Sequence, residues 1–200
     1  KVVLNGVDVS TLSDKMASKF RNRTVGFVFQ MNNLLPEFSA VENVMMPGLI
    51  AGGVKEAVGQ RARELLTAVN LEHRLSHRPA EMSGGMCQRV AIAQALIMRP
   101  KLLLLDEPFG ALDEATRESL QLMILQLYEE NMQARKAGQP EPHTVLIVTH
   151  ELNEALYVSD RILGLSQYHT GGSEGATIVY DKPAPIFRPN EPKDVSTFNE

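Results

Sequence analysis

The sequence predicts an α/β domain built on a mostly parallel sheet, and three observations lead to this fold class. Short apolar runs occur at residues 24–30, 102–108, 144–150 and 161–166. Each run is closed by polar residues or proline, which is typical of buried parallel strands. Helical patterns lie between the runs, and strands that alternate with helices favour a parallel sheet.

The elements follow in order along the chain. The first residues, "KVVLNGVDV", indicate a β-rich segment, and the run "TVGFVFQ" predicts the first long strand. The glycine-rich and proline-rich stretches at 136–143 and 168–175 predict loops, and "KPAPIFRPNEP" predicts an extended tail. Helices are expected at roughly 55–69, 86–98, 114–133 and 151–157.

Composition and charge narrow the possible functions. Of the 200 residues, 44% are hydrophobic and 22% are charged, as in an ordinary globular protein. The formal net charge of −4 gives little support for binding to nucleic acid or to acidic membranes. Cys87 is the only cysteine, so an internal disulfide is excluded. No apolar run reaches eighteen residues, so membrane contact is expected only through a partner.

A serine and two glycines precede the helix expected at 86–98. The N-terminus of a helix presents unpaired N–H groups that attract anions, and glycines let a phosphate approach the backbone. Ser83, Gly84 and Gly85 therefore form a candidate phosphate contact. A plain turn before a helix would explain the same triplet.

Polar side chains also follow three of the expected strands. Four leucines lead to Asp106 and Glu107, and the run 144–150 ends in His150. The run 24–30 ends in Gln30. Parallel sheets bind ligands at the carboxyl ends of their strands, where carboxylates could hold Mg²⁺ and polarise a water molecule. Singly, each residue also fits a structural role, as a solvated strand end, a capping histidine or a loop amide.

Together these segments resemble the ATP-binding subunit of an ABC transporter. "MSGGMCQRVAIAQAL" resembles the signature motif and its helix, although methionine stands where leucine is usual. "LLLLDEP" resembles the Walker B strand, "GALD" the D-loop, "VTHE" the switch-histidine loop and "FVFQ" the Q-loop. The matches extend from residue 25 to about 165. The resemblance implies a P-loop NTPase-like parallel sheet with helices on both faces, and a helical subdomain that carries the signature motif.

The resemblance also implies roles for individual residues and the cofactors ATP and Mg²⁺. Glu107 would act as the general base, His150 would contact the γ-phosphate, and Asp106 would coordinate Mg²⁺. Gln30 would sense both the metal and the membrane partner, and Asp113 would couple the two sites of a dimer. The ATP site of the opposite subunit would be completed by Ser83, Gly84 and Gly85.

A domain division and a set of partners follow from the same resemblance. Residues 1–200 would form a partial ATP-binding domain with a helical and signature region at about 31–98. A catalytic core would span 99–166, and a hairpin and tail 167–200. The partners would be a second ATP-binding subunit, in a homodimer, and transmembrane permease subunits, without nucleic acid. The protein would lie peripherally at the cytoplasmic face of the inner or plasma membrane.

One expected motif does not occur in the sequence. The phosphate loop G-x-x-x-x-G-K-[ST] is absent from residues 1–200. In the family it would precede Lys1, so the chain is expected to be truncated at its N-terminus. Because the backbone and lysine of that loop provide most of the contacts to the triphosphate, these residues alone are not expected to hydrolyse ATP.

The sequence does not identify the transported substrate. Residues 30–85 resemble ATPases of lipoprotein release and efflux, whereas residues 106–121 and 149–167 are more similar to importers of nitrate, sulfonate, taurine or urea-related compounds. The longer downstream match slightly favours an importer. Two other classes remain: an ABC-type ATPase without transport, and a regulatory binding module without hydrolysis. Glu107 and His150 argue against the second, because a degenerate site commonly loses one or both.

Overall fold

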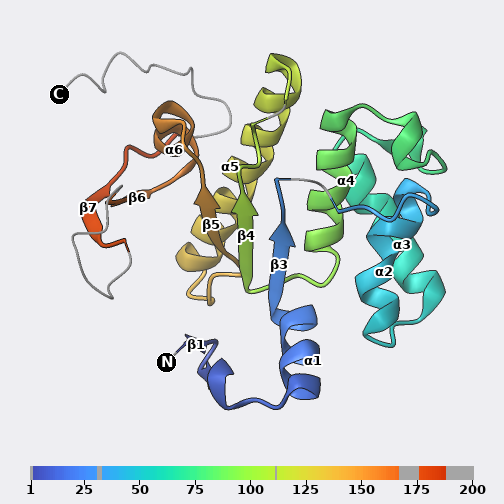
Figure 1. Ribbon diagram of the computed structural model, residues 1–200, viewed down its shortest axis with the longest axis horizontal. Helices are drawn as coiled ribbons and strands as arrows, with labels where there is room; N and C mark the ends of the chain where they lie inside the picture. Colours follow the sequence, from blue (N-terminus) through green and yellow to red (C-terminus); the bar gives the residue numbers. More distant parts are fainter. Residues whose placement is uncertain (1, 31–32, 111, 167–175, 188–200) are drawn as a thin grey trace.

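Three parallel strands form the centre of the molecule (Figure 1). The computed structural model describes residues 2–30, 33–110, 112–166 and 176–187. The strands β3 (Val25–Val28), β4 (Leu102–Asp106) and β5 (Thr144–Val148) pair in the order β3-β4-β5. Both pairs are parallel. The predicted α/β fold with a parallel sheet is therefore confirmed.

The four expected helices are present, and two helices are additional. The expected helices are α3 (Lys55–Ala68), α4 (Gly84–Leu96), α5 (Glu114–Lys136) and α6 (Leu152–Val158). The additional helices are α1 (Asp14–Thr24) and α2 (Ala40–Ile50). Pro47 and Gly48 lie inside α2 and lower its helix propensity, so local sequence gives a weak helical pattern there.

Two antiparallel hairpins accompany the sheet. The strands β1 (Val3–Leu4) and β2 (Val7–Asp8) pair near the N-terminus. The strand β6 (Arg161–Leu165) pairs with β7 (Ile178–Pro183). The predicted loop at 168–175 lies outside the described residues, as does the tail from residue 188 onward.

The two faces of the central sheet have different surroundings. Val28 and Leu105 are neighbours in register on the face that packs against the helical core. Phe27, Leu104 and Leu146 form the next row, on the opposite face, because side chains alternate along a strand. On this second face Phe27 and Leu146 are 43% and 49% exposed. The resemblance implied helices on both faces, whereas the described residues leave this face largely uncovered.

A helical region lies beside β3 and consists of α2, α3 and α4 (Figure 1). Asn43 of α2 is fully buried and stabilises the segment between β3 and α2. Its Nδ2 donates hydrogen bonds to the carbonyls of Leu35, Phe38 and Ser39, and its Oδ1 accepts one from the Leu35 N–H. Its own carbonyl accepts a 2.9 Å bond from Gln94 of α4. The buried amide thereby connects the segment to two helices.

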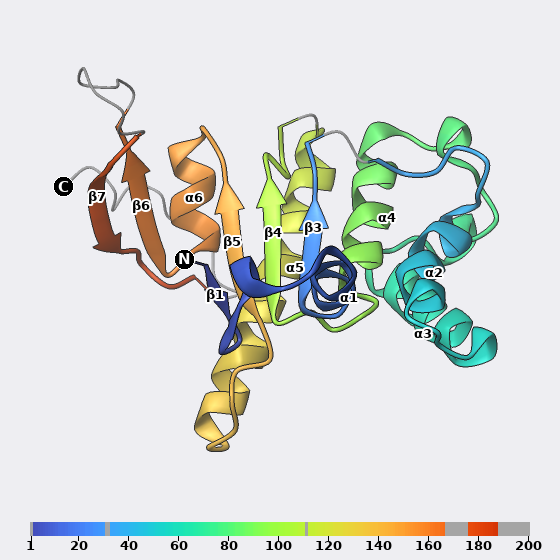
Figure 2. The ribbon, with the colours of Figure 1, turned by 60° about the horizontal axis from the view of Figure 1, so that its bottom comes forward.

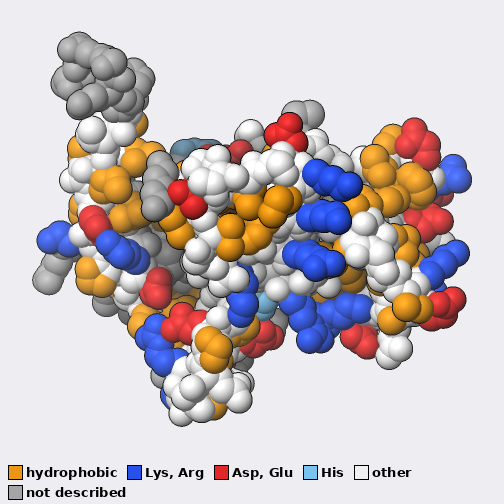
Figure 3. All heavy atoms as spheres, turned by 90° about the horizontal axis from the view of Figure 1, so that it is seen from below, with side chains coloured by type: hydrophobic (Ala, Val, Ile, Leu, Met, Phe, Trp, Pro, Cys, Tyr) orange, Lys and Arg blue, Asp and Glu red, His pale blue; other side chains and the backbone are white. Residues whose placement is uncertain are grey.

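The amino ends of the strands differ in charge from their carboxyl ends. Lys and Arg side chains gather around α1 in the view from below (Figure 3). Four exposed cations come from α1: Lys15, Lys19, Arg21 and Arg23. Figure 2 shows the long helix α5 running behind the sheet and extending beyond these amino ends. Among the described residues, no helix is both long and apolar enough to cross a membrane.

Candidate functional site

The carboxyl end of β4 carries two acidic residues in different backbone conformations. Asp106 is the last residue of the strand and belongs to the row of side chains on the less covered face. Glu107 has a φ of +48°, which is uncommon outside glycine and asparagine. Its N–H still donates a 2.9 Å hydrogen bond to the Val148 carbonyl, so the sheet holds it in place. Backbone strain of this kind is concentrated at functional sites.

Glu107 and His150 are in direct contact. The Nδ1 of His150 lies 2.8 Å from the Oε2 of Glu107, across the ends of the neighbouring strands β4 and β5. The Glu107 side chain is 18% exposed and the His150 ring is 69% exposed. The hydrogen bond to Glu107 and its negative charge raise the pKa of His150. The structure therefore brings together the two residues that the sequence assigned to hydrolysis.

Gln30 lies two residues beyond the end of β3 and is exposed. Because β3 and β5 flank β4 in a parallel sheet, Gln30 lies at the same edge as Asp106 and Glu107. No hydrogen bond connects Gln30 to either acid within the described residues. The three strand ends therefore share an edge, and only the Glu107–His150 pair is in contact.

The signature turn begins helix α4 as the sequence predicts. The Oγ of Ser83 caps the helix and accepts a 3.3 Å hydrogen bond from the Met86 N–H. A Cβ on Gly84 would meet nothing within 4 Å, so the backbone there is open to an approaching group. A Cβ on Gly85 would lie 2.7 Å from the Cγ2 of Thr116 in α5. Gly84 is thus open to solvent, whereas Gly85 permits close contact between α4 and α5.

Asp113 is the N-cap of α5. Its carboxylate accepts hydrogen bonds from the N–H of Thr116 at 3.0 Å and from the Thr116 hydroxyl at 2.7 Å. These two bonds are the main reason that the pKa of Asp113 is lowered, and the charge of Arg89 adds to the effect. Thr116 therefore contacts both Asp113 and Gly85, which connects the D-loop segment to the signature turn. Ala111 lies outside the described residues.

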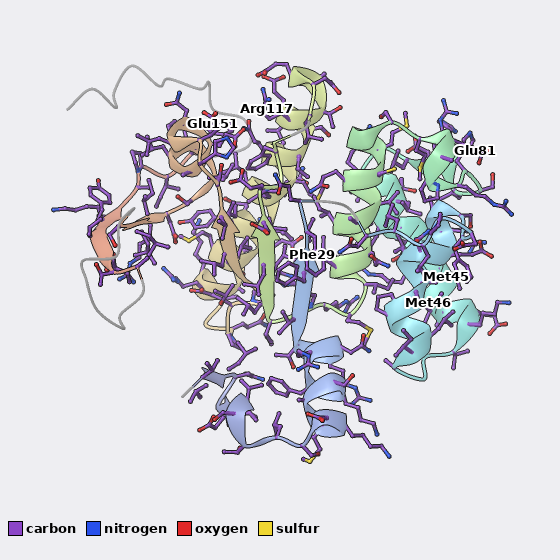
Figure 4. The ribbon with its side chains drawn as sticks, in the orientation of Figure 1. Phe29, Met45, Met46, Glu81, Arg117 and Glu151 are labelled. Carbon is purple, nitrogen blue, oxygen red and sulfur yellow. The ribbon has the colours of Figure 1, made fainter. Side chains whose placement is uncertain are left out.

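A cavity of about 470 Å³ separates the start of α5 from the start of α6. Arg117 and Glu151 lie at this end of the molecule (Figure 4). An ion pair that no sequence pattern predicts connects the two helices, with the Nε of Arg117 3.3 Å from the Oε1 of Glu154. The lining includes Phe109, Gly110, Glu114, Arg117, His150 and Glu154.

The donor set at the strand ends fits Mg²⁺ only together with a phosphate ligand. Among the described residues, no group of three or more His, Cys, Asp or Glu side chains could hold a metal ion. Asp106 offers a carboxylate and Gln30 an amide oxygen, both of which are hard donors. Mg²⁺ usually binds through one or two carboxylates together with substrate phosphates and water. The residues present are compatible with that arrangement.

The fold is an α/β domain whose strand ends carry the residues that the resemblance assigned to ATP hydrolysis. The chain belongs to the ABC transporter family, whose profile matches residues 1–110. It is 48% identical to the lipoprotein-releasing system ATP-binding protein LolD 2 of Caulobacter vibrioides, over 84% of this chain and 69% of that protein. It is 44% identical to LolD of Syntrophus aciditrophicus, over 82% of this chain and 69% of that protein.

Solved structures agree with this assignment. The chain is similar to the ATP-binding cassette MJ0796, a dimer in a post-hydrolysis state bound to ADP and Pi. The TM-score is 0.69 at 35% identity, over 80% of this chain and 66% of that one. A second dimeric structure of MJ0796 gives a TM-score of 0.64 at 38% identity. The predicted class, an ABC-type ATPase subunit of a transporter, is therefore confirmed, and the relatives agree with the lipoprotein-release resemblance of residues 30–85.

Proposed function

We propose that this chain forms most of the ATPase subunit of a lipoprotein-releasing transporter, and that it works as one half of a dimer. The contact between Glu107 and His150 is the observation that carries the catalytic part of the proposal. The names of the relatives support the substrate class, and the dimeric cassette structures support the assembly. In this proposal, the helical region at about 31–98 contains the signature turn, and the core at 99–166 contains the catalytic residues.

Glu107 is assigned the role of activating water. Its Oε2 is occupied by His150, which leaves Oε1 to accept a proton from a water molecule that attacks the γ-phosphate. The hydrogen bond to His150 fixes the orientation of the carboxylate. When His150 is protonated, which its raised pKa favours, Nε2 of the exposed imidazole also carries a proton and can donate to a phosphate oxygen.

Asp106 and Gln30 are the residues that would hold Mg²⁺ beside the phosphates of ATP. The ion supplies neutralisation of the charge on the phosphate oxygens. A phosphate loop is also needed to hold the triphosphate, and its motif does not occur in residues 1–200. Ser83 and Gly84 are assigned to the ATP held by the second subunit, since the open backbone at Gly84 can receive a group from outside the chain.

The catalytic assignment is tested in a protein that carries these residues together with a phosphate loop. Replacing Glu107 with Gln preserves the size of the side chain and removes the base, so ATP turnover should fall by about 10²-fold or more. Binding of ATP should persist. The Glu56→Gln change, at an exposed position of α3, is the matched control and should leave turnover unchanged. Near-normal turnover of Glu107→Gln would show that this carboxylate is not the base.

The partner surface is assigned to the helical region that follows Gln30. Leu49, Ile50 and Val54 are exposed apolar side chains at and just beyond the C-terminal end of α2. Such a patch suits the cytoplasmic surface of a membrane permease, and binding there would place the protein peripherally at the inner membrane.

This docking surface is tested by co-purification with the permease subunits. Replacing Ile50, which is 71% exposed, with Glu should abolish co-purification without unfolding the protein. Val179→Glu, an equally exposed apolar position on β7, is the control and should retain the permease. If both variants bind the permease normally, the contact surface lies elsewhere.

A further inference from the structure

An ion pair that none of the roles above uses lies next to the Glu107–His150 contact. We propose that Arg117 and Glu154 are positioning residues that hold the loop bearing His150 in a fixed relation to the turn that ends at Asp113. The purpose of this arrangement rests on the proposed ATPase function. Its geometry does not, and the test below is carried out without ATP.

Arg117 stabilises the turn before α5. Its Nη2 donates a 3.2 Å hydrogen bond to the carbonyl of Leu112, the residue that precedes the helix cap Asp113. Its Nη1 donates a 2.6 Å hydrogen bond to Glu114, and its backbone N–H donates to the Asp113 carbonyl at 2.9 Å. The guanidinium therefore contacts Leu112, next to the last residue of the turn, and Glu114, the first residue of the helix.

Glu154 holds the other side, at the loop between β5 and α6. Its Oε2 accepts a 3.1 Å hydrogen bond from the hydroxyl of Thr149. The oxygen of the same hydroxyl accepts a 3.1 Å hydrogen bond from the N–H of Glu151. His150 is the residue between Thr149 and Glu151, so Glu154 fixes the backbone on both sides of it.

The ion pair joins these two sets of contacts, and both of its residues line the cavity of about 470 Å³. The Nε of Arg117 has no well-aligned hydrogen-bond acceptor, so its 3.3 Å approach to Glu154 is a charge contact rather than a directed bond. A path of contacts thus runs from the Leu112 carbonyl through Arg117, Glu154 and Thr149 to His150 and on to Glu107.

Burial makes this pair sensitive to the loss of either member. The Glu154 side chain is only 13% exposed, and burial raises the pKa of its carboxyl group, while the charge of Arg117 acts in the opposite direction. Removing one partner of a buried pair leaves the other charge uncompensated. The loop around His150 should therefore shift when Arg117 is neutralised.

The alternative is that the pair only ties α5 to α6 and leaves His150 unaffected. The pKa of His150 separates the two possibilities by its direction of change. Three carboxylates act on the imidazole: Glu107, Glu151 and Glu154. If the loss of the Arg117 cation acted only through its charge, the pKa of His150 would rise or stay unchanged. If the loop that bears His150 moved instead, the contact between His150 and Glu107 would break. The pKa of His150 would then fall toward the ordinary histidine value of about 6.5.

The experiment is a proton NMR titration of the histidine ring signals in the 200-residue chain and in Arg117→Gln. The His150→Gln variant identifies the signal of His150, and the other histidines serve as internal references. We expect the pKa of His150 to be lower in Arg117→Gln than in the unchanged protein. Arg135→Gln, in the same helix, is the matched control, because Arg135 pairs with Glu141 on the surface and should not affect His150.

A second variant tests the same path without changing any charge. Thr149→Val keeps the shape of the side chain and removes the hydroxyl that links Glu154 to the loop, so it should also lower the pKa of His150. If circular dichroism shows that Arg117→Gln does not fold, the pKa of His150 in Thr149→Val alone tests the proposal. An unchanged or raised pKa of His150 in the folded variants would overturn the proposal.

Discussion

Glu107 combines a strained backbone with a hydrogen-bonded side chain. A φ of +48° costs a residue with a Cβ about 1 kcal/mol, and the bond from its N–H to Val148 helps to keep it there. This conformation turns the carboxylate out of the alternation of β4 and toward the end of β5, where His150 lies. The geometry at one residue therefore decides which neighbour the carboxylate contacts.

The pKa of His150 provides a prediction at this scale. Because the hydrogen bond and charge of Glu107 raise it, Glu107→Gln should lower the pKa toward the ordinary value of about 6.5. A raised pKa in the folded protein stabilises the fold below the unfolded value of about 6.5, and the contribution is lost as pH rises through the folded pKa. The stability of the unchanged protein relative to His150→Gln should therefore be greater at pH 5 than at a pH above the folded pKa of His150.

Urea unfolding of both proteins between pH 5 and pH 9 measures this effect. His73→Gln, at an exposed position in another part of the fold, is the control for loss of an imidazole. A stability difference between the unchanged protein and His150→Gln that is the same at both ends of the pH range would contradict the assigned contact.

At the level of elements, the starts of α4 and α5 meet at Thr116. Thr116 contacts Asp113 through two hydrogen bonds and occupies the space where a side chain on Gly85 would project. The two glycines of the signature turn therefore differ in their physical role. Gly85 is required for packing within the chain, whereas a Cβ on Gly84 would meet nothing within 4 Å among the described residues.

This difference can be measured with alanine substitutions. Gly85→Ala places a methyl group 2.7 Å from Thr116, and its overpacking should destabilise the protein by about 1–3 kcal/mol. Gly84→Ala should leave stability within about 0.5 kcal/mol, because the space there is open. Thermal and urea unfolding test both. Equal destabilisation by the two substitutions would show that the junction is not packed as described.

The sequence predicted these elements unevenly, for physical reasons. The strands β3, β4 and β5 and the helices α3 to α6 were predictable because their apolar residues recur with clear periods. The sequence did not predict α2 because Pro47 and Gly48 lower its local helix propensity. Burial of Asn43 and its neighbours stabilises the helix in spite of this low propensity. The Arg117–Glu154 pair depends on the approach of two helices, which no spacing along the chain reveals.

At the scale of the whole molecule, the chain holds two sets of candidate residues that do not meet. Asp106, Glu107 and His150 lie at the ends of the strands, while Ser83 and Gly84 lie at the start of α4. Within the described residues, no hydrogen bond or ion pair connects the two sets. Separate sets in one chain are what a dimer requires if each subunit completes the site of the other, as proposed above.

Mutations in the two sets should therefore be separable in the protein with its phosphate loop. Gly84→Glu places a negative charge where the γ-phosphate of the partner's ATP would lie, and a like-charge contact in an interface costs several kcal/mol. Binding of ATP to a single subunit should hardly change, because Gly84 contributes nothing to the site of its own chain. Dimerisation driven by ATP and hydrolysis should both be lost.

A mixture of two inactive variants tests whether each signature turn serves the ATP of the other subunit. In a dimer of one Gly84→Glu subunit and one Glu107→Gln subunit, one site carries both lesions and the other carries neither, because each signature turn serves the ATP of its partner. Hydrolysis should therefore return in the mixture relative to either homodimer, provided that one intact site can act alone. Light scattering measures the ATP-dependent dimer, and phosphate release measures turnover. If Gly84→Glu alone forms dimers and hydrolyses ATP normally, Ser83 and Gly84 only begin a helix and do not contact ATP.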